Sequence, residues 1–130
     1  MDNLQKSEAV IARILAHLAE NGLQETQLNL NSLELDDDLL PFFLTCYRWL
    51  EAEGIVRSES LQVLMRGTFI IQNPVITAKG FQLLAQGVNL GGEEKSLGTA
   101  VKEVSSGRSY SSFGDFFGGL LGGFTRSISS

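Results

Sequence analysis

The residues able to do acid–base, nucleophilic or metal chemistry are few in this chain and are not grouped. His17 is the only histidine and Cys46 the only cysteine, and no catalytic signature surrounds either of them. Residues 91–96, GGEEKS, contain a glycine pair and a lysine, but the two carboxylates between them would repel a phosphate. The three consecutive aspartates at 36–38 lack the spaced oxygen ligands of a calcium loop. We therefore expect no enzyme activity, no cofactor and no metal site.

The charge of the chain is distributed unevenly. Through residue 86 there are six basic and eleven acidic residues, whereas four of each follow from residue 87 onward. Proteins attract nucleic acid through lysine and arginine, so an acidic body disfavours general binding to phosphate backbones. The length of 130 residues and the hydrophobic content of 43% fit one small domain with additional segments.

The compartment is expected to be the cytoplasm. A single cysteine excludes an intramolecular disulfide and agrees with a reducing environment. The first residues, MDNLQKSEAV, show no signal peptide. The longest apolar stretches are shorter than the ~20 residues that a membrane-spanning helix needs.

Apolar spacing predicts a first helix over residues 7–21. Its apolar face repeats at i, i+3, i+4 and i+7 and consists of Ile11, Ile14, Leu15 and Leu18. Gly22 follows where a C′ glycine is expected, and His17 lies off the apolar face, so we expect it at the surface. A short strand is predicted at residues 27–30, with a brief helix starting near Asn31 or Ser32.

A second strong helix is predicted to start at Asp38, whose carboxylate can cap free backbone N–H groups, with Pro41 in the first turn. Its buried stripe should contain Phe43, Cys46, Tyr47 and Leu50. Gly54 should end this helix, with Ile55 folding back onto Leu50. Cys46 on this stripe is expected to be an inert core residue.

Strands are predicted at residues 55–57, 61–65 and 68–72, with a tight turn at Arg66 and Gly67. Asn73 and Pro74 should end the last strand. Thr77 should cap a further helix that carries Phe81, Leu84 and Ala85 toward the core and ends at Gly87.

The stretch 47–86, YRWLEAEGIVRSESLQVLMRGTFIIQNPVITAKGFQLLAQ, carries the end of a helix, a β-hairpin and a capped helix. This order resembles the winged-helix (winged helix-turn-helix) family, including small bacterial and phage proteins of that family. The resemblance covers residues 7–87 and implies an α+β fold with a β-hairpin wing. It also implies a short second helix after the first strand. We predict a winged-helix domain at 1–87, a linker with a short helix (within 93–104) at 88–112, and a glycine-rich tail at 113–130.

The tail, SFGDFFGGLLGGFTRSISS from residue 112, has an unusual pattern of phenylalanine, leucine and glycine. On a helix, its phenylalanine, leucine and isoleucine side chains fall within an arc of about 140°, and all five glycines fall outside it. Five glycines weaken such a helix by about 4–5 kcal/mol relative to alanine, so it requires a surface to pack against. The candidate packing residues are Phe113, Gly114, Phe117, Gly118, Leu121, Gly122 and Phe124. A low-complexity tail without fixed structure, or one docked on a membrane surface, are the alternatives.

Sequence-specific DNA binding is the activity that the family resemblance first suggests, with the helix before the wing in the major groove. Here that helix, with its start, spans residues 36–53 and carries five carboxylates against one cation, Arg48. Our leading hypothesis is therefore a non-enzymatic interaction module that binds protein and forms a homo-oligomer or larger assembly. One alternative is a DNA-binding regulator, and another is an acidic phage-type decoy of a nucleic-acid-binding protein. Candidate contacts to a partner or to DNA are Arg48, Trp49, Arg57, Arg66 and Lys79.

Overall fold

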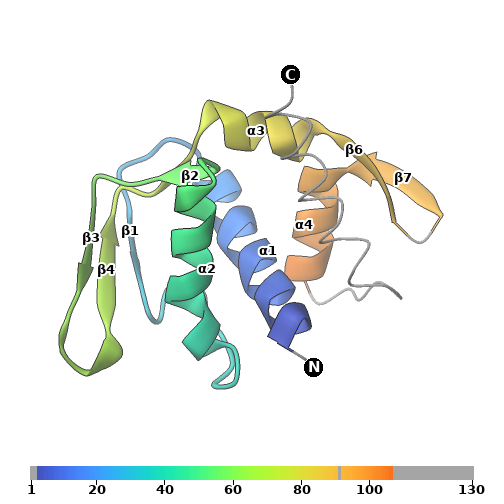
Figure 1. The fold of residues 1–130 in the computed structure, drawn as a ribbon. Helices are drawn as coiled ribbons and strands as arrows, with labels where there is room; N and C mark the ends of the chain where they lie inside the picture. Colours follow the sequence, from blue (N-terminus) through green and yellow to red (C-terminus); the bar gives the residue numbers. More distant parts are fainter. Residues whose placement is uncertain (1–2, 91, 107–130) are drawn as a thin grey trace.

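Helix α1 is the centre of the molecule, with other elements packed on both of its sides (Figure 1). The computed structural model describes residues 3–90 and 92–106. The helices are α1 (Asn3–Asn21), α2 (Leu40–Ala52), α3 (Ala78–Ala85) and α4 (Leu97–Ser105). The strands are β1 (Gln27–Asn29), β2 (Val56–Arg57), β3 (Ser60–Val63), β4 (Phe69–Gln72), β5 (Val75–Ile76), β6 (Gly87–Leu90) and β7 (Glu93–Ser96), with a 3-10 turn η1 (Met65–Gly67). The chain is therefore an α+β protein.

Strands in the described part pair only in the antiparallel sense. The largest sheet has the order β1-β4-β3, with Leu28 and Leu61 both opposite Ile71. Strands β2 and β5 form a second sheet, and β6 and β7 form a hairpin. Helices α2 and α4 both pack against α1, and α3 packs against α4. Figure 1 shows the β3–β4 hairpin and the β6–β7 hairpin on opposite sides of the helices.

The apolar face predicted for the first helix is confirmed. Ile11, Ile14, Leu15 and Leu18 are all buried on α1. The helix begins at Asn3 rather than near Ser7, and the Ser7 hydroxyl donates to the Asn3 carbonyl at 2.8 Å. Gly22 has a φ of +67°, and its N–H donates to the Leu18 carbonyl, as expected for a C′ glycine.

The strand expected at 27–30 is present as β1, but residues 30–39 form turns and not a brief helix. The Asn29 side chain accepts from the Asn31 N–H at 3.0 Å, and the Ser32 hydroxyl accepts from the Asn29 N–H at 2.9 Å. Such local bonds from side chain to backbone compete with helix formation.

The N-cap prediction at Asp38 is also wrong, because α2 starts at Leu40 after an N-cap residue, Leu39, whose side chain makes no capping bond.

The remainder of α2 agrees with prediction. Its buried residues are Phe43, Cys46, Tyr47 and Leu50. Gly54 has a φ of +78° and donates to the Glu51 carbonyl, while Ile55 donates to the Leu50 carbonyl at 2.9 Å. These two bonds form a Schellman ending, and the side chains of Leu50 and Ile55 are both fully buried.

The predicted hairpin is present as β3, η1 and β4, with its turn at Arg66 and Gly67. Asn73 ends β4 with a φ of +51° and donates its N–H to the Thr26 carbonyl. The chain then forms β5, which pairs with β2 and was not anticipated. This small sheet fixes the end of α2 to the start of α3.

Helix α3 is rotated relative to our prediction, which placed Phe81 and Ala85 in the core. The cap is confirmed, since the Thr77 hydroxyl accepts from the Gly80 N–H at 3.0 Å. The buried residues are Gly80, Leu83 and Leu84, whereas the Phe81 side chain is 42% exposed. A Cβ on Gly80 would clash with the Ile55 carbonyl and lie 2.6 Å from Ile76 Cγ2. The helix thus approaches β2 and β5 through its glycine, which turns Phe81 outward.

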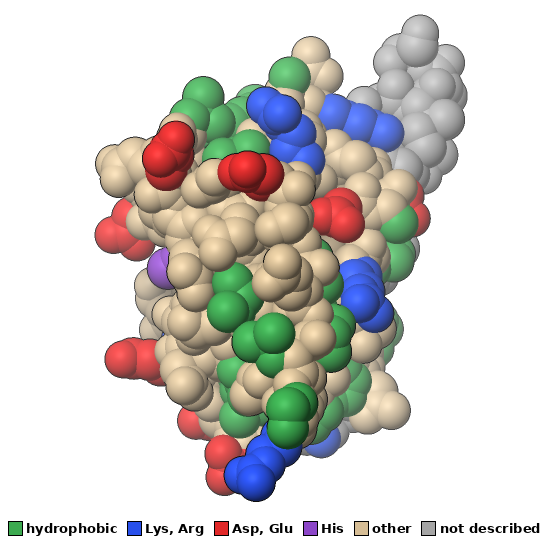
Figure 2. Space-filling view, turned by 90° about the vertical axis from the view of Figure 1, so that its left-hand side faces the viewer, with side chains coloured by type: hydrophobic (Ala, Val, Ile, Leu, Met, Phe, Trp, Pro, Cys, Tyr) green, Lys and Arg blue, Asp and Glu red, His purple; other side chains and the backbone are tan. Residues whose placement is uncertain are grey.

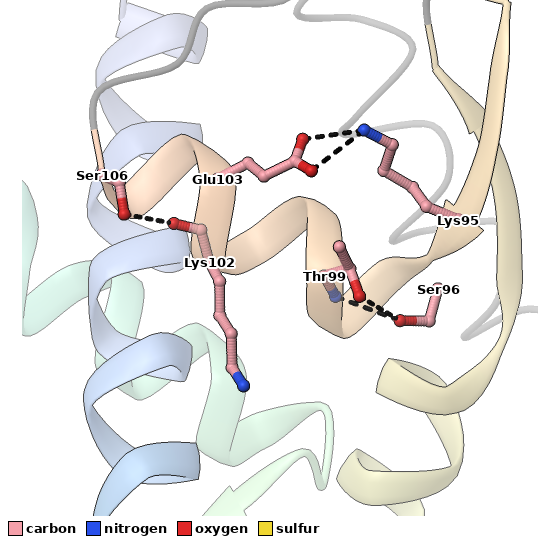
Figure 3. A network of polar contacts seen from close by, with 6 residues as sticks. All are labelled: Lys95, Ser96, Thr99, Lys102, Glu103 and Ser106. Atoms are coloured by element: carbon pink, nitrogen blue, oxygen red, sulfur yellow. Dashed lines mark hydrogen bonds and ion pairs between the residues drawn. The ribbon is translucent and has the colours of Figure 1, made fainter.

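The described part of the expected linker is folded, and Gly87 begins a strand. Strands β6 and β7 form a hairpin, and the short helix expected within 93–104 is α4, which packs along α1. Lys95 of β7 contacts both carboxylate oxygens of Glu103 at 3.1 and 2.8 Å (Figure 3). The Ser96 hydroxyl caps α4 by accepting from the Thr99 N–H at 3.1 Å. The packed body therefore continues beyond residue 87. The predicted tail, residues 113–130, lies outside the described residues.

Candidate functional site

The five predicted contact residues lie on four elements of the fold. Arg48 is exposed on α2, Arg57 is exposed on β2, and Arg66 is exposed at the turn of the β3–β4 hairpin. Lys79 lies in the first turn of α3 with its side chain close to Gly54. Figure 1 shows α3 and the hairpin turn at opposite ends of the molecule, so Lys79 and Arg66 do not belong to one patch. Trp49 is half-buried and packs against the core.

The outward face of α2 has few cations. Its exposed side chains are those of Pro41, Thr45, Arg48, Glu51 and Ala52. The three aspartates of residues 36–38 are exposed just before the helix begins, and Ser58 donates a hydrogen bond to the Glu51 carboxylate at 3.1 Å. Negative charge therefore flanks Arg48 at both ends of the helix.

The turn between β3 and β4 presents large apolar side chains to solvent. Val63, Leu64 and Met65 are consecutive, and their exposed fractions are 54%, 44% and 83%. Together with Thr68 they line a shallow hollow, and we call these four residues the wing-tip surface. In the lower part of Figure 2, hydrophobic side chains gather beside lysine or arginine side chains.

Backbone geometry fixes the wing-tip surface. Arg66 and Gly67 have φ values of +63° and +75°, the positive values that a type I′ hairpin turn requires at its two central residues. Leu64 donates its N–H to the Thr68 carbonyl at 2.8 Å, and the Thr68 hydroxyl donates to the Met65 carbonyl at 2.9 Å. The apolar side chains are thus held on an ordered turn.

The register explains why these side chains reach beyond the core. Val63 pairs with Phe69, which is buried, and Leu61 pairs with Ile71, which is also buried. Alternation along a strand places Val63 on the same sheet face as Leu61, at the far end from the helices. The core ends near Phe69, so Val63 and the two residues after it extend past the core.

The opposite face of this sheet is polar and uncharged. It consists of Gln27, Asn29, Ser60, Gln62 and Gln72, with Ile70 among them. Figure 2 shows a broad uncharged area on this side of the molecule, with most acidic side chains near its margins. A surface of this kind offers hydrogen bonds without attracting a polyanion.

Sequence reasoning found the hairpin but missed the wing-tip surface. The strand predicted at residues 61–65 is present as β3 but ends at Val63, and the apolar side chains of residues 63–65 are exposed. The missed signal was three successive apolar residues directly before a tight turn, where solvent-exposed loops usually carry polar side chains.

The titratable groups inside the α2 stripe are held in their neutral forms. Burial raises the pKa of the Cys46 thiol to about 11, an effect that the Ser7 side chain partly opposes. The thiol itself donates to the Ser7 carbonyl at 3.8 Å. Burial also raises the pKa of the Tyr47 hydroxyl to about 12, an effect that Ser58 opposes and the Glu51 charge reinforces. A thiol held protonated is a poor nucleophile, as expected for a core cysteine.

Other chemical groups are scattered in the described part of the chain. His17 is half-buried, with the Asn21 amide nitrogen 3.1 Å from its Nε2. Within residues 3–90 and 92–106, no three His, Cys, Asp or Glu side chains are placed to hold a metal ion. None of the helices in these residues is both long and apolar enough to cross a membrane.

Comparisons of the chain with protein-family models, with curated protein sequences and with solved structures found no match. The functional argument therefore rests on the surfaces of this chain itself.

Proposed function

We propose that this chain is a non-enzymatic interaction module, a winged helix adapted to protein contacts, with residues 113–130 used for self-association or partner docking. The order helix, strand, helix and hairpin supports the winged-helix arrangement. So does the sheet order β1-β4-β3, in which the strand between the first two helices pairs with the second strand of the hairpin. The departure is the segment 30–39, where turns replace the short helix of the family.

The observation that carries this proposal is the wing-tip surface. Exposed apolar side chains that adjoin one another mark interaction sites on soluble proteins, and methionine is enriched at such interfaces. Val63, Leu64 and Met65 lie on an ordered turn, so binding a partner requires little further ordering of the backbone. The wing tip is thus suited to an apolar partner surface.

DNA binding is disfavoured by the charges around α2 and the wing. A recognition helix normally presents Arg, Lys, Asn or Gln to base edges and phosphates. Here Arg48 lies between exposed carboxylates, and the hairpin turn offers only Arg66 among three large apolar side chains. Dispersed cations would neutralise few phosphates, so affinity for duplex DNA would be low at physiological salt.

Sedimentation of the full chain tests the wing-tip part of the proposal. We expect an assembled parent whose average mass falls in Met65→Glu, because the new carboxylate would have to be desolvated in the contact. The matched control is Gln62→Glu, which adds the same charge on the same hairpin but on the other face of the sheet. An equal effect of both substitutions, or a parent that is monomeric at every concentration, would argue against self-association through the wing tip.

A second arm tests the tail. Gly118→Ala should leave the assembly intact or weaken it slightly, because alanine raises helix propensity by about 1 kcal/mol and adds only one methyl group. Gly118→Leu keeps most of that propensity but prevents close approach of a second backbone, so the assembly should be lost. Identical masses for both variants and the parent would exclude glycine packing.

Tight binding of duplex DNA at about 150 mM salt, abolished by Arg66→Ala, would replace the proposal with the DNA-binding alternative.

A further inference from the structure

A groove on the far side of the molecule from the wing lies between α1, α3 and α4. It encloses about 280 Å³ and is lined mainly by small or apolar residues. Six of these residues are Ala16, Ala19, Phe81, Leu84, Ala85 and Gly98. A water molecule occupies roughly 30 Å³ of liquid, so the groove is far larger than a site for a single water molecule.

Two features show that the groove is an unfilled apolar surface in the described part of the chain. Phe81 is 42% exposed, and Ala85 on the same helix is also exposed. Both side chains would be buried if other parts of the protein fully covered the apolar face of α3. Gly80 holds α3 against Ile55, and this contact leaves Phe81 directed toward the groove.

The chain leaves its described part beside this groove. Helix α4 ends at Ser105, and a neighbouring hollow is lined by Ser105 and Ser106. That hollow shares the lining residues Ala16 and Lys102 with the groove, so the two adjoin each other. Figure 3 shows the Lys102 side chain pointing away from the Lys95–Glu103 pair, consistent with its place in the lining of the groove. Ser106, the last described residue, therefore lies beside a hollow that adjoins the groove.

The sequence that follows has the length and pattern to fill the groove. Residues 107–112, GRSYSS, are polar or small and span up to about 20 Å when extended. The apolar face of the tail starts at Phe113 and includes three more phenylalanines and two leucines. A short tether gives such a segment an effective concentration in the millimolar range at a neighbouring site.

We infer that the groove between α1, α3 and α4 is the docking site for the phenylalanine and leucine face of residues 113–128 of the same chain. The small residues of the groove accept large side chains, and the large side chains of the tail need a surface to hold them in a helix. The glycine face of the docked tail is then directed outward, where a second copy can approach closely. This inference rests on the tail part of the proposed function and adds the surface that the tail contacts.

The experiment is nuclear magnetic resonance on the full chain with labelled alanine methyl groups. The methyls of Ala16, Ala19 and Ala85 line the groove, whereas Ala52 and Ala78 are exposed outside it and serve as internal controls. We expect nuclear Overhauser effects from the groove methyls to the tail leucines Leu120 and Leu121. Replacing both leucines with serine should remove these effects and shift the groove methyls alone. Thr125→Ser, outside the apolar arc, should leave all five methyl signals unchanged.

A mixture of labelled and unlabelled chains identifies the source of the tail. In the inferred arrangement, the contacts disappear when only effects between different molecules are recorded. Contacts that persist in that experiment would overturn docking within one chain and place the tail in a second copy. Absence of any contact between the groove methyls and the tail would overturn the groove as a docking site. Loss of assembly in Gly118→Leu with the methyl contacts retained would separate the two proposals, since only the outward glycine face would have failed.

Discussion

The rings of Phe43 and Phe69 meet edge to face, with centroids 4.9 Å apart and planes at 86°. Phe43 belongs to the buried stripe of α2, and Phe69 is the first residue of β4, directly after the hairpin turn. Both side chains are almost fully buried. This contact joins the hairpin that carries the wing-tip surface to the helical core, so the stability of the core and the position of the hairpin depend on the same pair.

Replacing Phe43 with alanine should destabilise the fold by about 3–5 kcal/mol, because it empties an aromatic core site. The matched control is Phe81→Ala, which removes the same atoms from a side chain that is 42% exposed in the described part of the chain. Urea unfolding should show a far smaller loss for Phe81→Ala. Equal losses for the two variants would mean that Phe81 is as well covered as Phe43.

Gly80→Ala should destabilise the protein, although alanine is the better helix former. The added Cβ would meet the Ile55 carbonyl and Ile76 Cγ2, and we expect a cost of about 1–3 kcal/mol from overpacking. Gly87→Ala is the matched control, because a Cβ at that position has no heavy atom within 4 Å. Its stability should be unchanged or raised by up to ~1 kcal/mol. A stabilised Gly80→Ala, measured by urea unfolding, would contradict the close approach of α3 to β2.

Local patterns predicted the elements whose signals lie within a few residues of one another. The face of α1, the stripe and Schellman ending of α2, the turn at Gly67 and the cap at Thr77 all follow from spacing or from a single residue type. These signals do not depend on what the element packs against. Helix α4 was also predicted, as a short helix within residues 93–104.

Tertiary contacts decided the features that the sequence did not reveal. Phe81 looked like a core residue because large aromatic side chains are usually buried, but Gly80 faces Ile55 and sets a different rotation of α3. The β6–β7 hairpin was missed because glycine and charged residues in 87–96 resemble a linker. The groove could not be foreseen either, since its lining combines residues of α3 and α4 with residues of α1, which is far from both in the sequence.

The stability of the protein should fall at alkaline pH, starting below the range where lysine titrates. An unfolded cysteine ionises near its usual pKa of about 8.5, whereas burial raises the pKa of Cys46 to about 11 in the folded chain. The unfolded state therefore loses its proton first. The stabilisation is complete below the unfolded pKa and is lost as the pH rises through the folded pKa. Tyr47, with its pKa raised to about 12, extends the fall in the same direction.

Urea midpoints measured at several pH values between 8 and roughly 10.5 test this dependence. Cys46→Ala should show a shallower fall over that interval, because the thiol that titrates is gone. The same slope in Cys46→Ala as in the parent would mean that Cys46 does not carry the effect. In the parent, alkylation of Cys46 at neutral pH should be slow until urea unfolds the chain.

The hydroxyl of Thr77 forms hydrogen bonds to two elements. Replacing Thr77 distinguishes the contribution of these hydrogen bonds to stability from the contribution of side-chain volume. The oxygen accepts from the Gly80 N–H at 3.0 Å and donates to the Gly54 carbonyl at 2.6 Å, so it caps α3 and binds the end of α2. Thr77→Val keeps the shape but loses both bonds, and we expect a loss of about 1–2 kcal/mol. Thr77→Ser keeps the hydroxyl and should cost less. Urea unfolding of the two variants beside the parent measures the difference. If valine were tolerated as well as serine, the hydroxyl would not hold α3 to the end of α2, and the rotation of α3 that exposes Phe81 would rest on Gly80 alone.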